Sequence, residues 1–445
     1  MAMEAAPAAR HARKVERVVA QLRAHQGDKP VSLRKRSVSH QVPKAHDLRR
    51  HDDKIDIGDL TEILAIDSVA RTCTAESGVT FVDLVAATMK HGLVPIVVPE
   101  LKTITIGGAV AGCSIESMSF KEGGFHDTCL EYEVVAATGE VLTCTPANEH
   151  ALVFEMVHGT FGTLGVLTRL TFRLIAAKPY VHLVYERHPT LAAYLAAIDR
   201  HATAEDVDFI DGIIHSPTLW VLCLGRFVDA APYRSRYDWV KVFWQSTAKR
   251  EDDYLTTPDY FFRYDRGVTN VRPRSLIGRL LFGKLLSSTQ WLWIADKVHW
   301  ALPDQRPTIT LDVFVPFGKV PEFMAWYQRE FRFFPLWCVP YRVVKNYPWL
   351  EAAYQPAPDD NLYLDLAIYG MKQRDDGRNY HRLMEEKLAE LGGFKTLIAH
   401  NYYPEAEFWT IWNRRTYDEV KRRTDPKNLL RGLYEKTCKA AMGRT

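Results

Sequence analysis

Short β-branched and apolar runs alternate with two helical stretches between about residues 31 and 174. Runs of this kind, bounded by turn residues, predict strands. The predicted strands read VSLRK, KIDI, RTCTAE, PIVVP, EYEVVAA, EVLTCT and VLTRLTFRLI. FVDLVAATMKHG, which ends on Gly92, and HALVFEMVHGTFG have the apolar spacing of helices. The mixture predicts an α/β or α+β domain with a core large enough to hold a cofactor.

The pattern changes near Lys178. Residues 180–400 contain most of the eleven Trp and many Tyr and Phe, with the strand-like runs WVLCLGRFV, ITLDVFVPF and NLYLDLAIYG between longer helices. This segment is predicted to be a second, aromatic-rich domain that shapes a pocket, although aromatic density is also typical of an ordinary core. The residues after Tyr402 are helical and basic.

Before the first predicted strand, Val15, Val18, Val19 and Leu22 have the spacing of an amphipathic helix. We expect this helix to pack on the first domain. The predicted units are a first domain over 20–177, a second domain over 178–400 and a C-terminal segment over 401–445.

Composition excludes several classes of protein. The protein has 445 residues, 47% of them apolar and 25% charged, as in soluble globular proteins of two or more domains. The net charge of +3 is too small to attract nucleic acid to the protein surface as a whole. Seven scattered cysteines argue against a disulfide framework or zinc site. No apolar stretch reaches the roughly 18 residues of a membrane span, and no signal peptide is visible, so a cytoplasmic protein is expected.

Several familiar motifs are also missing. The sequence contains no GxxxxGK[ST], no GxGxxG after a strand, no GxSxG and no HExxH. These absences argue against a P-loop, an ordinary Rossmann site, a hydrolase nucleophile elbow and a zinc metalloenzyme. No metal site is therefore predicted.

Three short segments have the composition of anion-binding backbone. In the first, Gly107 and Gly108 follow the β-branched run TITI, where missing side chains let backbone approach a diphosphate. Arg34–His40 places basic and hydroxyl side chains at a strand exit, and Gly159–Gly165 is a third glycine-rich bend. The alternatives are β-turns that bind nothing and a solvated charge run.

All three segments occur within one block that resembles a known family. TITIGGAVAGCSIESMSFKEGGFHDTCLEYEVVAATGEVLTCT is similar to the FAD-binding domain of the vanillyl-alcohol oxidase superfamily. PELKTITIGGAVAGCSIES, CTPANEHALVFEMVHGTFGTLG, PTITLDVFVP, FPLWCVPYR and NLYLDLAIYG are similar in order and spacing to the delta-24-sterol reductase (Diminuto) group.

The resemblance implies an α+β fold of two domains. These are a vanillyl-alcohol-oxidase-type (PCMH-type) FAD-binding domain and an aromatic-rich α+β substrate domain, with the C-terminal segment packing back on the first. The membrane-anchoring N-terminal helix of the eukaryotic sterol reductases is missing, and the first loop lacks the superfamily's usual glycines.

The resemblance also implies which residues contact FAD. Attachment is expected to be noncovalent, with His40 and His126 as polar contacts or turn residues, although some relatives link FAD through a His. The implied contacts are Arg36, Ser37, Ser39, His40, Pro99, Gly107, Gly108, Gly112, Cys113, Ser114, Glu116, Gly124, His126, Asp127, Gly162, Gly165 and Val166.

The implied reaction is reduction of an isolated carbon–carbon double bond in the side chain of a sterol or isoprenoid-like lipid, with NADPH as a candidate electron donor. Such an alkene needs an acid beside the hydride source. Each acid candidate is equally a buried residue with a satisfied polar group. The candidates are Tyr341, Arg342, Asp365, Tyr369 and the run from His400 to Tyr403, which includes Tyr402.

Two alternative functions remain open at this point. One is an FAD-dependent alcohol oxidase or dehydrogenase of the same superfamily, and the other is a flavin-fold protein that binds lipid without turnover. Residues 275–300 combine Leu, Phe and Trp with Arg279, Lys284 and Lys297. This stretch predicts peripheral contact with an anionic membrane, and its alternative is a helix pair of the second core.

Overall fold

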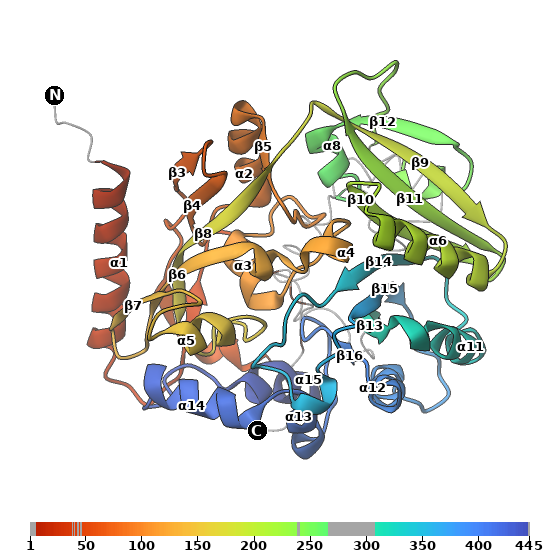
Figure 1. Ribbon diagram of the computed structural model, residues 1–445. Helices are drawn as coiled ribbons and strands as arrows, with labels where there is room; N and C mark the ends of the chain where they lie inside the picture. The colour runs from red at the N-terminus through yellow and green to blue at the C-terminus, as the bar shows by residue number, and fades with distance from the viewer. Residues whose placement is uncertain are drawn as a thin grey trace, which may run out of the picture.

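The computed structural model describes residues 6–37, 39, 41, 44, 47–237, 241–265 and 308–443. Two large sheets stand beside each other, and helix α3 (Ile106–Gly112) lies between them (Figure 1). His40 and the stretch 275–300, both singled out in the sequence, lie outside the described residues. Among the described helices, none combines the length and apolar composition that crossing a membrane requires.

The first sheet is antiparallel, with the strand order β3-β4-β8-β6-β7 and β5 paired to β8. Its longest strand, β8, buries alternate residues, as the run VLTRLTFRLI predicted. The sequence pattern had missed β3, and of PIVVP only the first residue pairs, at the end of β5. The strands are β3 Ile63–Asp67, β4 Thr72–Glu76, β5 Leu93–Pro95, β6 Cys129–Val135, β7 Val141–Cys144 and β8 Val166–Ala176.

Short helices cover this sheet and connect its strands. Both predicted helical stretches are present, and Gly92 ends the first of them in the left-handed conformation, with φ 66°. The helices and helical turns are η1 Leu48–His51, α2 Phe81–Thr88, η2 Met89–His91, α4 Ser119–Glu122, η3 Phe125–Thr128 and α5 Ala151–Met156.

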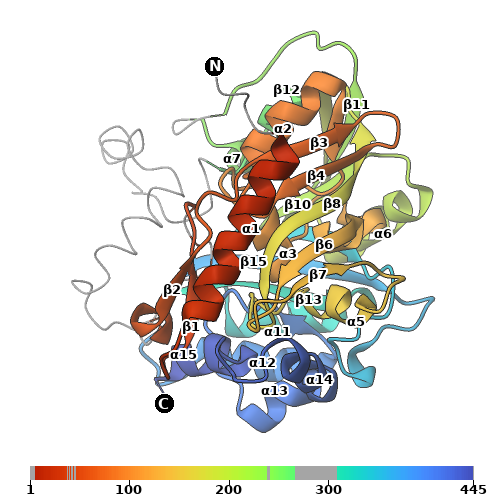
Figure 2. The ribbon, with the colours of Figure 1, turned by 90° about the vertical axis from the view of Figure 1, so that its left-hand side faces the viewer.

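Helix α1 (Pro7–Ala24) runs along the first sheet, as Figure 2 shows. It buries Val15, Val18 and Leu22, the apolar face that the sequence predicted, against a small core that includes Ile55. The same core receives the parallel pair β1 (Val31–Arg34) and β2 (Asp53–Asp56). The packed unit therefore starts at Pro7, before the boundary expected at residue 20.

The second sheet has eight antiparallel strands in the order β12-β9-β11-β10-β14-β15-β13-β16. It begins directly after β8. Its strands are β9 Tyr180–His188, β10 Phe209–Ser216, β11 Leu219–Val228, β12 Asp252–Thr256, β13 Ile309–Pro316, β14 Leu336–Arg342, β15 Leu362–Met371 and β16 Phe394–Lys395. Its helices and helical turns are α6 Leu191–Ala204, α7 Phe243–Ser246, α8 Thr257–Phe261, η5 Phe317–Lys319, α11 Val320–Glu330, η6 Ala352–Tyr354 and α12 Tyr380–Leu391.

The two faces of the second sheet have different neighbours. On β15, Leu364, Leu366 and Ile368 pack with α6, α11 and α12 in one core. Tyr363 and Ala367 belong to the core that contains the first sheet. We call the side that carries Tyr363 and Ala367 the inner face. Because side chains alternate along a strand, odd-numbered residues of β15 share the inner face.

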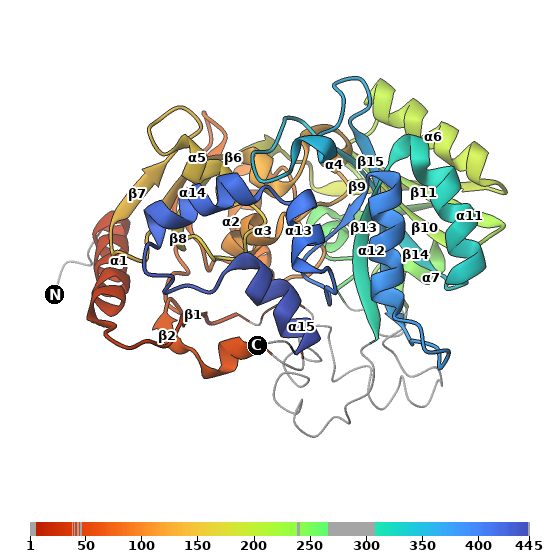
Figure 3. The same cartoon turned by 90° about the horizontal axis from the view of Figure 1, so that it is seen from below.

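The C-terminal segment returns to the first unit. Figure 3 shows α14 beside α5, and the backbone N–H of Val31 donates to the Leu429 carbonyl at 2.9 Å. The N-terminal and C-terminal segments therefore meet at β1. The helices are α13 Glu405–Ile411, α14 Arg414–Thr424, the π-helical turn η7 Glu435–Lys439 and α15 Ala440–Met442.

Candidate active site between the two sheets

Gly107 and Gly108 lie at the start of helix α3. The prediction that a β-branched run leads into a loop turn at these glycines is therefore wrong. The Thr105 side chain accepts a hydrogen bond from the Gly108 N–H at 3.2 Å and caps the helix, which overrides the β-propensity of TITI. A Cβ on Gly107 would lie 2.7 Å from the Ser77 Cβ. Gly108 is exposed, and a Cβ there would meet only the Thr105 Oγ1, at 3.1 Å. Packing requires Gly107, whereas Gly108 leaves open backbone for a ligand.

The backbone after α3 joins the second glycine segment. The Phe125 N–H donates to the Ser114 carbonyl at 2.9 Å. The Gly124 N–H donates to the Asp127 Oδ2 at 2.8 Å, and a Cβ on Gly124 would lie 2.5 Å from the His126 ring. The structure thus brings together residues that the resemblance assigned to one site.

The third glycine segment contacts the end of α3. The Phe161 N–H donates to the Ala111 carbonyl at 3.1 Å, beside Gly112 and Cys113. Gly162 has φ 70° and no close neighbour at its Cβ position, so it presents open backbone. A Cβ on Gly165 would lie 2.6 Å from Val134, so packing against β6 requires that glycine.

Other assigned residues have more varied surroundings. Arg36 is exposed beyond β1, and Ser37 is half-buried. The Ser39 hydroxyl accepts from the Gln41 N–H at 3.4 Å. Pro99 is buried directly before Glu100, and Val166 begins β8.

A cluster of cations lies where the first loop meets the C-terminal segment. Burial, with the nearby charge of Arg49, lowers the pKa of Lys44 to about 8 and that of Lys436 to about 7, and the exposed Lys35 adds a third charge near Lys436. Lys436 donates to the Phe161 carbonyl, beside the third glycine segment. Within the described residues, none of the three lysines forms an ion pair with a carboxylate. A bound diphosphate would be stabilised by all three charges, so these residues fit a dinucleotide cofactor.

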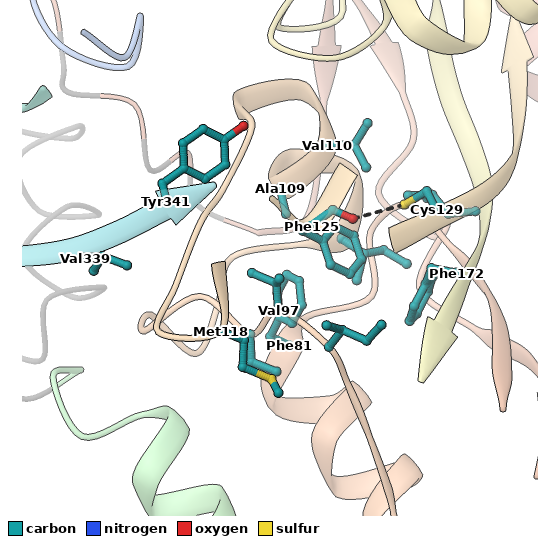
Figure 4. Packing of buried hydrophobic residues seen from close by; sticks show 14 of the residues in the cluster. Phe81, Val97, Ala109, Val110, Met118, Phe125, Cys129, Phe172, Val339 and Tyr341 are labelled. Carbon is teal, nitrogen blue, oxygen red and sulfur yellow. Dashed lines mark hydrogen bonds between the residues drawn. The ribbon is translucent and has the colours of Figure 1, made fainter. Parts of the chain in front are cut away.

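A series of hydrogen bonds links this region to the second sheet. The Tyr347 hydroxyl donates to the Asp127 Oδ2 at 2.8 Å and lies 3.1 Å from the Tyr341 hydroxyl. Figure 4 shows Tyr341 at the end of β14, near the segment that carries Phe125. Burial lowers the pKa of His126, which keeps its ring neutral. The candidate Tyr341 is therefore linked to the assigned residue Asp127 through one intervening hydroxyl.

Acidic side chains gather on the inner face. The Tyr369 hydroxyl donates to the Asp312 Oδ1 at 2.6 Å. Asp365 is 1% exposed, and its Oδ1 has no partner among the described residues. Burial is the main cause that raises the pKa of Asp312 to about 6, of Glu100 to about 7 and of Glu116 to about 8, and it raises the pKa of Asp365 well above its usual range. Several of these groups hold a proton at neutral pH.

One buried arginine ties the two units together at this place. The Arg263 Nη2 lies 2.8 Å from the Asp211 Oδ2 of β10 and 3.1 Å from the Glu116 Oε1 that follows α3. The guanidinium stands over the rings of Tyr260 at 4.2 Å and Tyr264 at 4.7 Å. Glu116 is therefore held in place by the second unit.

The structure does not bring the other acid candidates into this group. Arg342 donates to the Phe120 carbonyl at 3.0 Å and serves as a link between β14 and α4. His400 is buried near Lys44 and Lys395, and burial with these two charges lowers its pKa to about 3, so its ring is neutral and a poor acid at neutral pH. The Tyr402 N–H donates to Glu385 at 2.9 Å, and Tyr402 lies near His400 in the sequence.

Several functional residues were missed by sequence reasoning. Asp312 had a usable signal, because a carboxylate interrupts the apolar run ITLDVFVPF. No sequence signal marked the others, because only the folded protein places them beside the assigned residues. They are Tyr347, Lys44, Arg263 and Lys436.

Comparisons with known proteins agree with this geometry. A family model described as an FAD binding domain matches residues 6–145. A Delta(24)-sterol reductase of Arabidopsis thaliana is 27% identical over 481 residues, covering 96% of this protein and 85% of the relative. That of Homo sapiens is 27% identical over 407 residues, covering 86% and 77%. A cytokinin dehydrogenase of Oryza sativa subsp. japonica is 31% identical over 136 residues, 30% of this protein. The protein is an FAD-dependent oxidoreductase similar to the delta-24-sterol reductases.

Proposed function

We propose that the protein reduces an isolated carbon–carbon double bond in the side chain of a sterol or isoprenoid-like lipid by protonation and hydride transfer. Relatives that align along most of the sequence are named Delta(24)-sterol reductases. The acids on the inner face support a reaction that consumes a proton.

The observation that carries the proposal is the state of Asp365. An isolated trisubstituted alkene is not electrophilic, so an acid must protonate its less substituted carbon before hydride arrives at the other. Asp365 is buried on the inner face with one oxygen that has no partner among the described residues, and burial raises its pKa well above the usual range. Tyr341 is the weaker acid, because burial raises its pKa well above 10.

Aromatic side chains surround these acids on the inner face. They exclude water, and their rings stabilise the cationic character that protonation leaves on the tertiary carbon. The buried aromatic residues on this face are Phe314, Trp337, Tyr341, Tyr363 and Phe394.

The residues present fit noncovalent FAD. Lys35, Lys44 and Lys436 would hold the diphosphate, with open backbone at Gly108 and Gly162. Bound FAD supplies hydride in its reduced form, and NADPH is the proposed electron donor. Acid precipitation should release the flavin, whereas a yellow pellet would show a covalent link.

Anaerobic mixing of the purified protein with NADPH tests the function. We expect the visible absorbance of the flavin to bleach and to return when a sterol with a side-chain double bond is added. In deuterated water, mass spectrometry should find deuterium on the carbon that the acid protonates. An absorbance that NADPH leaves unchanged, but that an alcohol bleaches, would identify the oxidase alternative instead.

We further propose a cytoplasmic protein that contacts membranes peripherally through residues 275–300. The support is their sequence, in which cations alternate with an apolar stripe. Binding to anionic liposomes should be weak and salt-sensitive, and Arg279→Glu with Lys284→Glu should reduce it. Equal sedimentation of both proteins with liposomes, or of neither, would contradict this role.

A further inference from the structure

Asp365 belongs to a series of carboxyl groups that leads away from the buried interior. Asp312 lies opposite Ala367, and Asp365 lies opposite Phe314, so the two acids are diagonal neighbours on the inner face of adjacent strands. Glu100 precedes α3 and is half-buried, whereas Asp365 is 1% exposed. The series therefore has one end nearer solvent.

Asp312 occupies the middle of this series. It is the carboxylate whose charge acts most strongly on both Glu100 and Asp365. Its Oδ1 accepts the Tyr369 hydroxyl at 2.6 Å, and that hydroxyl also feels the charges of Glu100 and Asp365. The Tyr369 hydroxyl is thus bonded to the middle acid of the series.

A buried proton donor must be protonated again after each turnover, and the series of carboxyl groups offers a route. After protonating substrate, Asp365 is a carboxylate with almost no exposed surface, so it does not recover a proton from bulk water directly. We propose that Glu100 and Asp312 return a proton to Asp365 after each turnover, with the Tyr369 hydroxyl joining them. This inference rests on the proposed function, because it assumes that Asp365 is the donor.

The proton balance closes over one cycle. The Asp365 O–H bond breaks as its proton forms a C–H bond with the alkene electron pair, and the second new C–H bond takes the hydride whose electrons come from NADPH. The Asp365 carboxylate then takes a proton from Asp312, Asp312 takes one from Glu100, and Glu100 takes one from water.

The surrounding charges oppose ionisation of the whole series at once. Glu116 follows α3, Asp211 lies on β10, and Asp265 lies near Glu100. Arg263 is the cation facing these acids among the described residues, and Asp211 holds it most closely, at 2.8 Å. One positive charge therefore faces many carboxyl groups, and ionising Glu100, Asp312 and Asp365 together would be unfavourable.

Comparing the rate of the first turnover with the rate of later turnovers distinguishes a residue that reprotonates Asp365 from a structural one. Enzyme reduced anaerobically, in the presence of excess NADPH, is mixed with a small excess of a sterol that has a side-chain double bond, and product is followed with time. In Glu100→Gln the first turnover should keep the wild-type rate, because Asp365 starts protonated, while later turnovers slow about tenfold or more. Asp365→Asn should slow the first turnover itself by about 10²-fold or more.

Controls separate this effect from misfolding. Glu149→Gln removes a carboxyl whose side chain is 78% exposed, far from the series, and should match wild type in every turnover. Formic acid, a small proton carrier, should restore later turnovers of Glu100→Gln. Later turnovers as fast in Glu100→Gln as in Glu149→Gln, or a first turnover slowed equally with the later ones, would overturn the proposal.

A second measurement decides the case if no alkene is reduced. That result would contradict the proposed function. Infrared difference spectra at neutral pH would then test separately whether the carboxyl groups of the series hold protons. Loss of protonated-carboxyl signal in Glu100→Gln and in Asp365→Asn would support it. Spectra identical to wild type would overturn it.

Discussion

At the scale of single residues, the two adjacent glycines of α3 have different reasons to be glycine. Gly107 lies against the backbone of Ser77, so a methyl group there must displace that backbone. Gly108 points to open space beside its capping residue, Thr105. The first is a requirement of the fold, and we propose that the second serves the cofactor.

Substitution separates these requirements. Gly108→Val should purify folded but colourless, because its side chain blocks approach of the diphosphate to the backbone. Gly107→Ala should lower the free energy of unfolding by about 1–3 kcal/mol through overpacking. Flavin absorbance per protein and urea unfolding measure the two effects. A Gly108→Val protein that is yellow at full stoichiometry would show that this helix end is not the cofactor site.

At the scale of elements, α1 is fastened to the first sheet by buried charge. The His11 Nδ1 lies 2.9 Å from the Glu76 Oε1 of β4, and its Nε2 lies 2.8 Å from the Glu133 Oε1 of β6. Lys14 adds a second contact to Glu76, at 2.8 Å. Burial by itself lowers the pKa of His11, but its hydrogen bonds to Glu133 and Glu76 outweigh burial and raise the pKa to about 9.

This fastening should depend on pH. Because the folded pKa of His11 lies above its ordinary value of 6.5, the stabilisation is complete below about pH 6.5 and is lost as the pH rises through about 9. Urea unfolding across this range should show the loss in wild type, together with faster proteolysis at α1. His11→Gln should remove most of this alkaline dependence, and an equal dependence in both proteins would contradict the assignment.

At the scale of the whole molecule, the two sheets are joined by polar groups around Arg263. The Ser117 hydroxyl lies 2.9 Å from the Tyr260 hydroxyl, and the Ile210 N–H donates to the Ser117 carbonyl at 2.8 Å. Arg263 binds Glu116 of the first unit and Asp211 of the second. The candidate site is thus shaped by contacts between the two units.

Arg263→Leu should destabilise the protein by about 3–5 kcal/mol, because it leaves the buried Asp211 carboxylate without its partner. Adding Asp211→Asn should recover much of this loss, which a double-mutant cycle in urea measures. The exposed pair of Arg414 and Asp418 is the matched control, and Arg414→Leu should cost less than about 1 kcal/mol. Equal losses for the two arginines would contradict a buried role for Arg263.

The sequence by itself determined the strands β8, β11, β13 and β15, because the period of two and the apolar runs are local properties of the sequence. It also indicated the three cofactor segments, because glycines at close spacing and the family resemblance are both visible in one dimension. Among these three segments the first differed in kind, because a side-chain cap at Thr105 makes it the helix α3 where a turn was expected.

The tertiary structure alone decided which face of each strand the site uses. Alternation places Asp365 opposite in direction to Leu364 and Leu366, but only docking of the two units makes the Asp365 side the inner face. The same folding brings Lys436 beside Phe161 and Tyr347 beside Asp127, across hundreds of residues. Contacts between distant segments depend on how whole elements pack, and local sequence patterns do not determine that packing.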